Sequence, residues 1–445
     1  MEYLVFSIIV LFFFITFVFH FSIKKDSCNF VSFVVKKTMK NKRKIINDPV
    51  FGFINIPNDF LYDVIQHRYF QRLHRIKQLG CSSVVYPGAQ HTRFQHSLGA
   101  MHLTSEAIKE LRAKGQEISP DEANGVMAAI LLHDIGHGPY SHVLENTIIQ
   151  GIRHEKISEI LMKKMNEEMN GALDLAIEIF QDRYHKKFLH QLVSSQLDMD
   201  RLDYLRRDSF FTGVVEGVIG SARIIKMLNV ADDKLVIEQK GIHSIENYLM
   251  ARRFMYWQVY LHKTSIATEI MLIKIFERAK DVALKGEKLF ASPFLNFFIE
   301  NNINEENFEQ NPEILENFAN IDDSDIISAI KVWQNHNDKI ISILSKNYID
   351  RILFKTKEQP NLSIEQNDDL LQKYSDFFGI NKNEAKYFFS EETIENNTYD
   401  IQNDGISVLF SDGYTKDISE VSDVINPFIL NRNVKKNFLC YYKIW

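Results

Sequence analysis

The sequence is poor in cysteine and carries no excess of positive charge. Its 445 residues include three cysteines, Cys28, Cys81 and Cys440, which share no metal-binding spacing. We therefore expect reduced thiols in a cytoplasmic protein rather than a disulfide framework. The formal net charge is −6, which provides no global basic field, so we do not expect a nucleic-acid partner.

Strand signals and internal repeats are also scarce. Between Gly80 and Leu284 the best strand candidate is 234–238, and no repeat is visible. With 45% hydrophobic residues, the chain can bury one large core and a smaller one. The predicted fold class is mostly α, with a smaller α+β C-terminal region. The predicted parts are an apolar segment 1–38, a main domain 39–285 and a C-terminal region 286–445.

Helical periodicity supports this fold class. We expect the C-terminal end to be a small β unit, because 406–410 and 434–443 are apolar and flank a turn at Ser411-Asp412-Gly413. Residues 361–403 are polar and are expected to form a hinge or loop with one helix. The predicted helices cover 59–79 (ending at Gly80), 96–111, 120–133 (capped by Ser119), 155–165, 188–197, 245–284, 326–332 and 339–344.

The first residues allow two interpretations. Residues 3–23 are nearly all apolar and lysines follow them, which favours a membrane anchor with the protein on the cytoplasmic side. No basic stretch precedes the apolar run, so a cleaved signal peptide fits less well. Alternatively, the start codon is assigned too early and translation begins at Met39.

The residues that carry chemistry centre on His133-Asp134. An apolar run, Ala129-Ile-Leu-Leu132, delivers this imidazole and carboxylate to a Gly/Pro break. Burying both is unfavourable unless a charge pairs with them. A divalent ion such as Fe, Mn, Zn or Mg suits that donor pair. The simpler alternative is a partly buried polar pair that ends a helix.

Three separated motifs indicate a family. Arg93-Phe-Gln-His96-Ser-Leu-Gly, His133-Asp134 and the segment from Asp198 to Asp208 resemble the HD-domain phosphohydrolases. Among these, the chain is most similar to the deoxynucleoside triphosphate triphosphohydrolases, which include the SAM-and-HD-domain enzyme. The resemblance runs from about residue 47 to 280, and no SAM domain precedes it. It implies an HD helical fold and a metal ion held by four ligands, His96, His133, Asp134 and Asp200, with Mg accompanying the nucleotide.

Further histidines follow the metal pair. His137, His142 and His154 lie close in sequence to Gly136 and Gly138, which favours phosphate contact and proton transfer. The resemblance implies that His142 is the general acid toward the leaving 5′ oxygen, that Glu145 orients it, and that His137 and His154 hold the phosphate charge.

A triphosphate requires fixed positive charge and a sugar pocket. The resemblance assigns phosphate contacts to Arg93, Arg201 and Arg252, although the family often has lysine at position 201. Tyr204 and Asp208 share a predicted helix face with Arg201. Tyr260 matches a tyrosine that disfavours a 2′-hydroxyl, and Gln78-Leu79 match a pair beside the sugar and base.

The resemblance also reaches a regulatory nucleotide site, in part. Five matching residues are kept: Lys44, Asn47, Gln71, Arg351 and Lys355. Gln66 and His74 replace the acidic and basic residues that recognise guanine in the vertebrate enzyme, so guanine specificity is not carried over. A homo-oligomer is implied as well.

The function predicted from the sequence is metal-dependent hydrolysis of dNTPs to deoxynucleoside and triphosphate. One alternative is an HD phosphohydrolase acting on another nucleotide phosphoester, such as a monophosphate or signalling nucleotide, because one fold hosts many substrates. The other is a non-catalytic nucleotide sensor, against which the retention of all four metal ligands argues.

Overall fold

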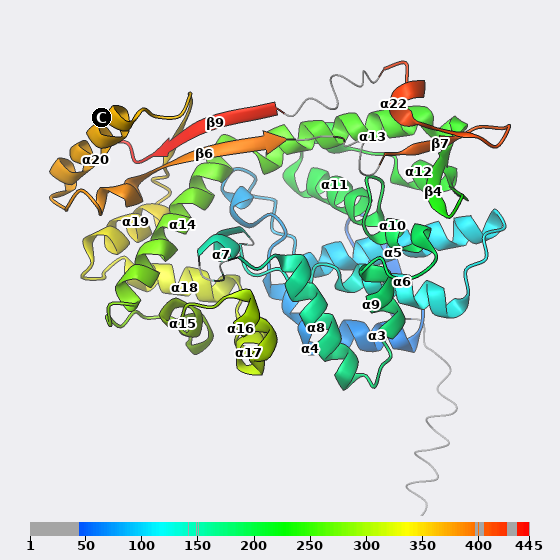
Figure 1. Ribbon diagram of the computed structural model, residues 1–445, viewed down its shortest axis with the longest axis horizontal. Helices are drawn as coiled ribbons and strands as arrows, with labels where there is room; N and C mark the ends of the chain where they lie inside the picture. The colour runs from blue at the N-terminus through cyan, green and yellow to red at the C-terminus, as the bar shows by residue number, and fades with distance from the viewer. Residues whose placement is uncertain are drawn as a thin grey trace, which may run out of the picture. The chain divides into compact units, whose positions relative to one another are not determined.

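A computed structural model describes residues 44–140, 142–147, 149, 151–396, 399, 405–424 and 434–444. It is mostly helical, as the sequence predicts, with short strands near its start and concentrated toward its C-terminal end (Figure 1). The apolar segment 3–23 and Cys28 lie outside the described residues. Among the helices that are described, none is both long and apolar enough to cross a membrane.

Four helices form the part of the core that carries the predicted metal ligands: α5 (Arg93–Ala113), α6 (Pro120–Leu132), α9 (Asp174–Phe180) and α11 (Met199–Thr212). Helix α5 packs against both α6 and α11, and α6 packs against α9. Capping side chains mark where two of these helices begin. The Ser119 side chain accepts a hydrogen bond from the Glu122 amide at the start of α6, and Asp198 does the same for Arg201 in α11.

The remaining elements are given in chain order. Strands β1 (Lys44–Asp48) and β2 (Gly52–Ile56) come first. The helices before and between the core helices are α3 (Asp59–Gln66), α4 (Arg68–Gln71), η1 (Arg72–Arg75), η2 (Gly80–Val84), α7 (His142–Thr147), α8 (His154–Glu168) and α10 (Lys187–Val193). After α11 come η3 (Val215–Gly217), α12 (Ser221–Met227), η4 (Gln239–Gly241), α13 (Ile242–Met255), the π-helical η5 (Tyr256–Tyr260) and α14 (Lys263–Ala283).

The C-terminal part adds further helices and two sheets. Its helices are α15 (Pro293–Glu300), α16 (Glu305–Gln310), α17 (Pro312–Asn320), α18 (Asp323–Trp333), α19 (Lys339–Ile349), α20 (Ile364–Phe378), η6 (Ala385–Phe388) and α22 (Ile418–Val421). One sheet has the order β3 (Leu228–Ala231), β4 (Lys234–Glu238), β7 (Ser407–Leu409), β8 (Thr415–Asp417). The other has the order β5 (Lys355–Glu358), β9 (Val434–Tyr441), β6 (Phe389–Asn396).

The structure corrects two expected helices. The run 59–79 is broken into α3, α4 and η1, because His67 takes an extended conformation and its side chain caps α4 through the Tyr69 amide. The run 245–284 is broken before α14, where His262 likewise caps the new helix through the Thr264 amide. A capping side chain competes with helix continuation at both points.

The C-terminal β unit is also corrected. β7 pairs in parallel with β4, whereas β9 pairs with β5 and β6, so the two expected strands join different sheets. The segment expected to be a hinge with one helix contains α20 but also all of η6 and β6. β4 lies before residue 285 and β7 lies after it, so the pairing of these two strands crosses the predicted domain boundary. The boundary itself stays a prediction.

Candidate metal centre and substrate site

Three helix ends bring the four predicted metal ligands together. His96 lies in the first turn of α5, His133 ends α6 and Asp134 follows it, and Asp200 lies in the first turn of α11. Nε2 of His96 is 3.0 Å from Oδ1 of Asp200, and Nε2 of His133 is 3.4 Å from the same oxygen. Asp134 lies 3.8 Å from His96 and 3.3 Å from His133.

In each of the two histidine rings, the hydrogen bond of Nδ1 determines that Nε2 faces this cluster. Nδ1 of His96 is 2.7 Å from Oδ2 of Asp203, and Nδ1 of His133 is 2.7 Å from the carbonyl oxygen of Ile130. Since a carboxylate and a carbonyl accept hydrogen bonds, each Nδ1 carries the proton and each Nε2 presents a lone pair. Both Nε2 atoms are buried without a hydrogen bond in the described part of the chain.

Lone pairs that face carboxylate oxygens at 3.0–3.4 Å repel them unless a proton or a metal cation lies between. The ligand atoms of His96, His133 and Asp200 lie within 4.8 Å of one another. These donors, two imidazoles and carboxylates, suit a divalent ion. When bound, such an ion supplies Lewis acidity toward a phosphoryl oxygen and toward water.

The charge around the cluster favours a cation as well. Burial lowers the pKa of His96, but Asp200 and Asp203 outweigh it and raise that pKa to about 10, so without a metal ion a second proton binds at Nε2, the position that a metal ion would take. The pKa of Asp200 is lowered despite its burial, because His133 and His96 stabilise the carboxylate. The protein thus holds negative charge at the point where the two Nε2 atoms converge.

A buried ionic chain supports His96 from behind. Asp203 is fully buried and also accepts two hydrogen bonds from Arg207, each 2.9 Å long. Arg207 in turn donates to Asp48 at 2.7 Å. Gly99 makes room for this chain, because a Cβ there would stand 1.9 Å from Asp203 and 2.2 Å from Arg207. The sequence interpretation missed Asp203, although it lies inside the Asp198–Asp208 motif one helical turn after Asp200.

The turn after Asp134 is fixed from α8. The Gly136 amide donates to the Ser158 hydroxyl at 2.9 Å, and that hydroxyl donates to the carbonyl oxygen of His133 at 2.7 Å. A Cβ at Gly136 would stand 2.1 Å from the carbonyl oxygen of His154. Only glycine therefore allows this approach, which brings the start of α8 to the metal ligands.

His137 and His154 form a second group with Asp134. Their rings stack with centroids 3.7 Å apart, and Nε2 of His137 is 3.3 Å from Oδ1 of Asp134. One ligand atom from each of the three residues lies within 4.8 Å of the others. Burial, and then the charge of Arg93, lower the pKa of His137 to about 3. The predicted role of His137 and His154 in holding the phosphate charge stays a prediction.

The structure describes the side chain of Glu145, the predicted partner, but not that of His142, the predicted general acid. His142 begins α7, and its side chain lies outside the described part, so its role as general acid stays a prediction. Glu145 is in the same helix, and its carboxylate lies 3.3 Å from Nδ1 of His154. This contact does not test the prediction that Glu145 orients His142.

The predicted phosphate arginines are buried or partly buried. Arg93 donates to Oδ2 of Asp134 at 2.5 Å and is 6% exposed. Arg201 donates to the carbonyl oxygen of Ser195 at 2.7 Å. Arg252 in α13 donates to Gln196 at 2.7 Å, and its Nε has no hydrogen bond within the described residues. Buried cationic side chains of this kind are expected where an anion is bound.

The predicted sugar residues lie on α11 and η5. The Tyr260 hydroxyl donates to Oδ2 of Asp208 at 2.7 Å, and the Tyr204 and Tyr260 rings meet edge to face at 5.9 Å. His91, which the sequence interpretation missed, lies 2.7 Å from Oδ1 of Asp208 and is fully buried at its side chain. The Gln78 amide donates to the carbonyl oxygen of His91 at 3.0 Å, and Leu79 follows at the start of η2.

The candidate regulatory residues are only partly brought together. Arg351 and Lys355 line a cavity of about 360 Å³ together with Lys263, Thr264, Leu353, Phe354 and Thr356. Lys44, Asn47 and Gln71 are not among the residues that line it. The Gln71 side chain donates to the carbonyl oxygen of Ile65 at 2.7 Å.

Comparisons with known proteins agree with this centre. Residues 93–208 match the HD domain, and residues 219–292 match the HD associated region. A phosphohydrolase from Bacteroides thetaiotaomicron has a crystal structure that is 61% identical, with a TM-score of 0.88, over 90% of this chain and 100% of that one.

Two curated relatives are more distant. The uncharacterized protein YwfO of Bacillus subtilis is 31% identical over 86% of this chain and 89% of its own length. The deoxynucleoside triphosphate triphosphohydrolase SAMHD1 homolog of Dictyostelium discoideum is 30% identical over 54% of this chain and 50% of its own length.

Proposed function

Because the chain belongs to the HD-domain phosphohydrolase superfamily, we propose that it hydrolyses dNTPs to deoxynucleoside and triphosphate with a divalent metal ion held by His96, His133, Asp134 and Asp200. The single observation that carries the metal part is the pair of buried Nε2 lone pairs that face Asp200. The relatives named as dNTP triphosphohydrolases support the substrate.

In this proposal the arginines carry the charge of the triphosphate. Arg93, Arg201 and Arg252 reach the site from α5, α11 and α13. Their cationic groups are held in place before substrate arrives by Asp134, Ser195 and Gln196. Preorganised cations stabilise charge that develops on phosphoryl oxygens without first having to rotate into position.

The sugar would lie against Tyr204, Asp208 and Tyr260, with Gln78 and Leu79 beside it. The Tyr260 ring would crowd the 2′ position, and its hydroxyl is held by Asp208. His142 would donate a proton to the leaving 5′ oxygen, with Glu145, His137 and His154 around it.

The test is a nucleotide panel. Metal-loaded protein is incubated with the four dNTPs, the four NTPs, dNMPs and cyclic dinucleotides, and products are separated by HPLC. We expect deoxynucleoside and intact triphosphate from dNTPs. Turnover confined to monophosphates or to signalling nucleotides would replace this proposal with the alternative HD phosphohydrolase. Binding of nucleotides with no turnover under any metal would indicate a sensor.

We also propose that the cavity with Arg351, Lys355 and Lys263 binds the phosphates of a regulatory nucleotide. All three cationic side chains line this cavity. Cationic side chains gathered around one cavity favour the binding of a polyphosphate. Replacing Lys355 by Ala should weaken activation by added nucleotide and leave the unactivated rate unchanged. Identical activation curves for the variant and the wild type would contradict the site.

A further inference from the structure

Arg72 is a buried arginine outside the sites described above. It begins η1, is 0% exposed, and burial lowers its pKa to about 9. One guanidinium nitrogen donates to the carbonyl oxygens of Ile135 and His137, each at 2.9 Å. These two carbonyls belong to the turn that follows the metal ligands His133 and Asp134.

The other guanidinium nitrogen joins this turn to the C-terminal part of the chain. It donates to the carbonyl oxygen of Phe318 at 3.3 Å, in the last turn of α17, and the guanidinium lies 4.7 Å from the centre of the Phe318 ring. Carbonyl oxygens at a helix end lack partners within the helix. A planar cation with several fixed donors can bind three such oxygens at once.

Three more polar contacts join the segment around Arg72 to the segment around Phe318. We call residues 312–325, which comprise α17 and the start of α18, the strap. Arg68 binds Glu316 through two bonds of 2.6 and 2.7 Å, Nε of Arg75 donates to Asp322 at 2.6 Å, and the Lys77 amide donates to Asp323 at 3.1 Å. Residues 68, 72, 75 and 77 thus contact 316, 318, 322 and 323 in the same order.

The segment held by the strap leads straight into the site. The amide of Arg93 donates to the carbonyl oxygen of Ile76 at 2.9 Å, and Lys77 forms an isolated β-bridge with Thr92. Gln78 follows immediately. A shift of the strap would therefore move Arg93, and through Arg72 also the backbone around His137.

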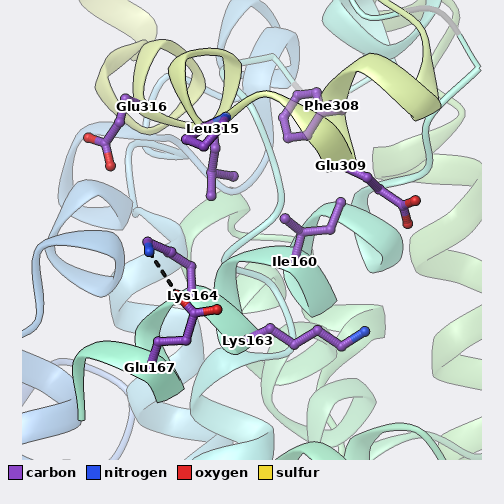
Figure 2. A pocket seen from close by; sticks show the side chains of 9 residues that line it. Ile160, Lys163, Lys164, Glu167, Phe308, Glu309, Leu315 and Glu316 are labelled. Carbon is purple, nitrogen blue, oxygen red and sulfur yellow. Dashed lines mark hydrogen bonds and ion pairs between the residues drawn. The ribbon is translucent and has the colours of Figure 1, made fainter. Parts of the chain in front are cut away.

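On its other side the strap borders a groove. Pro312, Leu315 and Glu316 of the strap line a cavity of about 450 Å³ together with Ile160, Lys163, Lys164 and Glu167 of α8 and with Phe308 and Glu309 of α16 (Figure 2). The strap faces α8 across this cavity, while its polar contacts with residues 68–77 are direct. Arg72 joins the strap to the carbonyl oxygens of the turn after Asp134.

We propose that Arg72 is a positioning residue that fixes the turn after Asp134 and makes the strap an integral part of the catalytic scaffold. The inference deepens the proposed function and rests on it for the activity measurements. It predicts a loss of turnover without a loss of metal ligands, because no metal-binding side chain is touched by the change.

The test compares Arg72→Met with Arg278→Met. Arg278 is also buried and anchors C-terminal residues, Asp338 and Glu384, at 2.6 and 2.8 Å, and neither of these residues belongs to the turn. With both proteins saturated with metal and held below their melting temperatures, we expect kcat of Arg72→Met to fall about tenfold or more, with KM and bound metal unchanged. Arg278→Met should lower the melting temperature and keep kcat, and Arg72→Lys should restore part of the loss.

A second measurement is independent of the substrate. Hydrogen–deuterium exchange should accelerate in peptides covering 129–140 and 312–325 in Arg72→Met but not in Arg278→Met. If wild-type protein turns over no nucleotide, the proposed function fails and exchange alone decides the role of Arg72. If Arg72→Met does not fold, Arg72→Lys is used for both measurements. Wild-type kcat and exchange in the folded Arg72 variant, or equal effects in Arg278→Met, would overturn the proposal.

Discussion

The metal centre and the strap act on the same turn but are assembled over very different distances in the chain. The four candidate ligands come from α5, the end of α6 and α11, within about one hundred residues. The strap contacts the segment 68–77 across sequence separations of 246 to 248 positions. The centre is therefore specified by short motifs, whereas its orientation also depends on a remote segment that no motif marks.

The contacts of the two regions differ in kind as well. Each ligand histidine is oriented by one specific acceptor, Asp203 or the Ile130 carbonyl oxygen. The strap instead offers three carboxylates and one carbonyl oxygen as acceptors in a row. Replacing one ligand of the metal centre should abolish turnover. Replacing one residue that holds the strap should only lower the turnover rate.

The largest effect is expected for the ligand that both Nε2 atoms face. Asp200→Ala leaves two imidazoles without the carboxylate that balances the metal charge, so bound metal and turnover should both be lost. Metal content is measured by mass spectrometry of the purified protein. Asp63→Ala, a change of an exposed carboxylate in α3, is the matched control. Wild-type metal stoichiometry in Asp200→Ala would refute the ligand assignment.

A smaller effect is expected one contact further out. Asp203→Asn keeps the shape of the side chain but weakens its hold on Nδ1 of His96, and an outer partner of this kind typically contributes about 10- to 100-fold to metal affinity. Competition with a chelator of known affinity measures the change. Asp63→Asn serves as the control. If Asp203→Asn bound metal as tightly as the wild type, the ionic chain behind His96 would be structural only.

The sugar preference tests a part of the site that belongs to neither region. Tyr260→Ala removes the ring and should raise the rate on ribonucleotides relative to deoxyribonucleotides, by about 5- to 150-fold for roughly 1–3 kcal/mol. Tyr260→Phe keeps the ring and loses only the bond to Asp208. If steric crowding decides, the Phe variant retains the preference. Equal wild-type rates on ATP and dATP would contradict this role.

The smallest effect concerns the strap and pH. Burial raises the pKa of Asp323 from 3.8 to about 6, against the lowering effect of the Lys77 amide. The folded state then binds this proton more tightly than the unfolded state, so the contribution of Asp323 to stability falls as pH rises from about 4 to 6. Asp323→Asn should remove that fall, worth on the order of 2 kcal/mol.

Urea unfolding at pH 4.5, 5.5 and 7, with metal chelated in both proteins, measures this difference. Chelation removes the pH-dependent stabilisation by bound metal, and the titration of the metal-centre histidines is common to both proteins. Parallel pH profiles for wild type and Asp323→Asn would show that the carboxylate is not destabilised by its burial within the strap.

The residues that could be predicted from the sequence are those whose roles follow from residue type and local spacing. His133 and Asp134 stood out because an apolar run delivers them, and Ser119 and Pro120 marked the start of α6. The mostly α fold followed from the scarcity of strand signals. Asp203 and Gly99 also lie in motifs, but their importance becomes visible only when α5 and α11 touch.

The remaining features depend on tertiary contacts. Arg72 lies within the predicted helix 59–79, and only the structure shows that it is buried and bound to three carbonyl oxygens. His67 and His262 ended helices whose periodicity continued past them, because a capping histidine has no strong sequence signature. β7 and β9 could be expected as strands, but their partners lie too far away in sequence to be inferred from local pattern.

The most direct test of the account is a single turnover experiment in H₂¹⁸O with metal-loaded protein and dATP, analysed by mass spectrometry. If the metal centre directs water to the α-phosphorus, the products are deoxyadenosine without label and triphosphate that carries one ¹⁸O. Formation of dAMP and pyrophosphate, or label in the 5′-hydroxyl of deoxyadenosine, would contradict it.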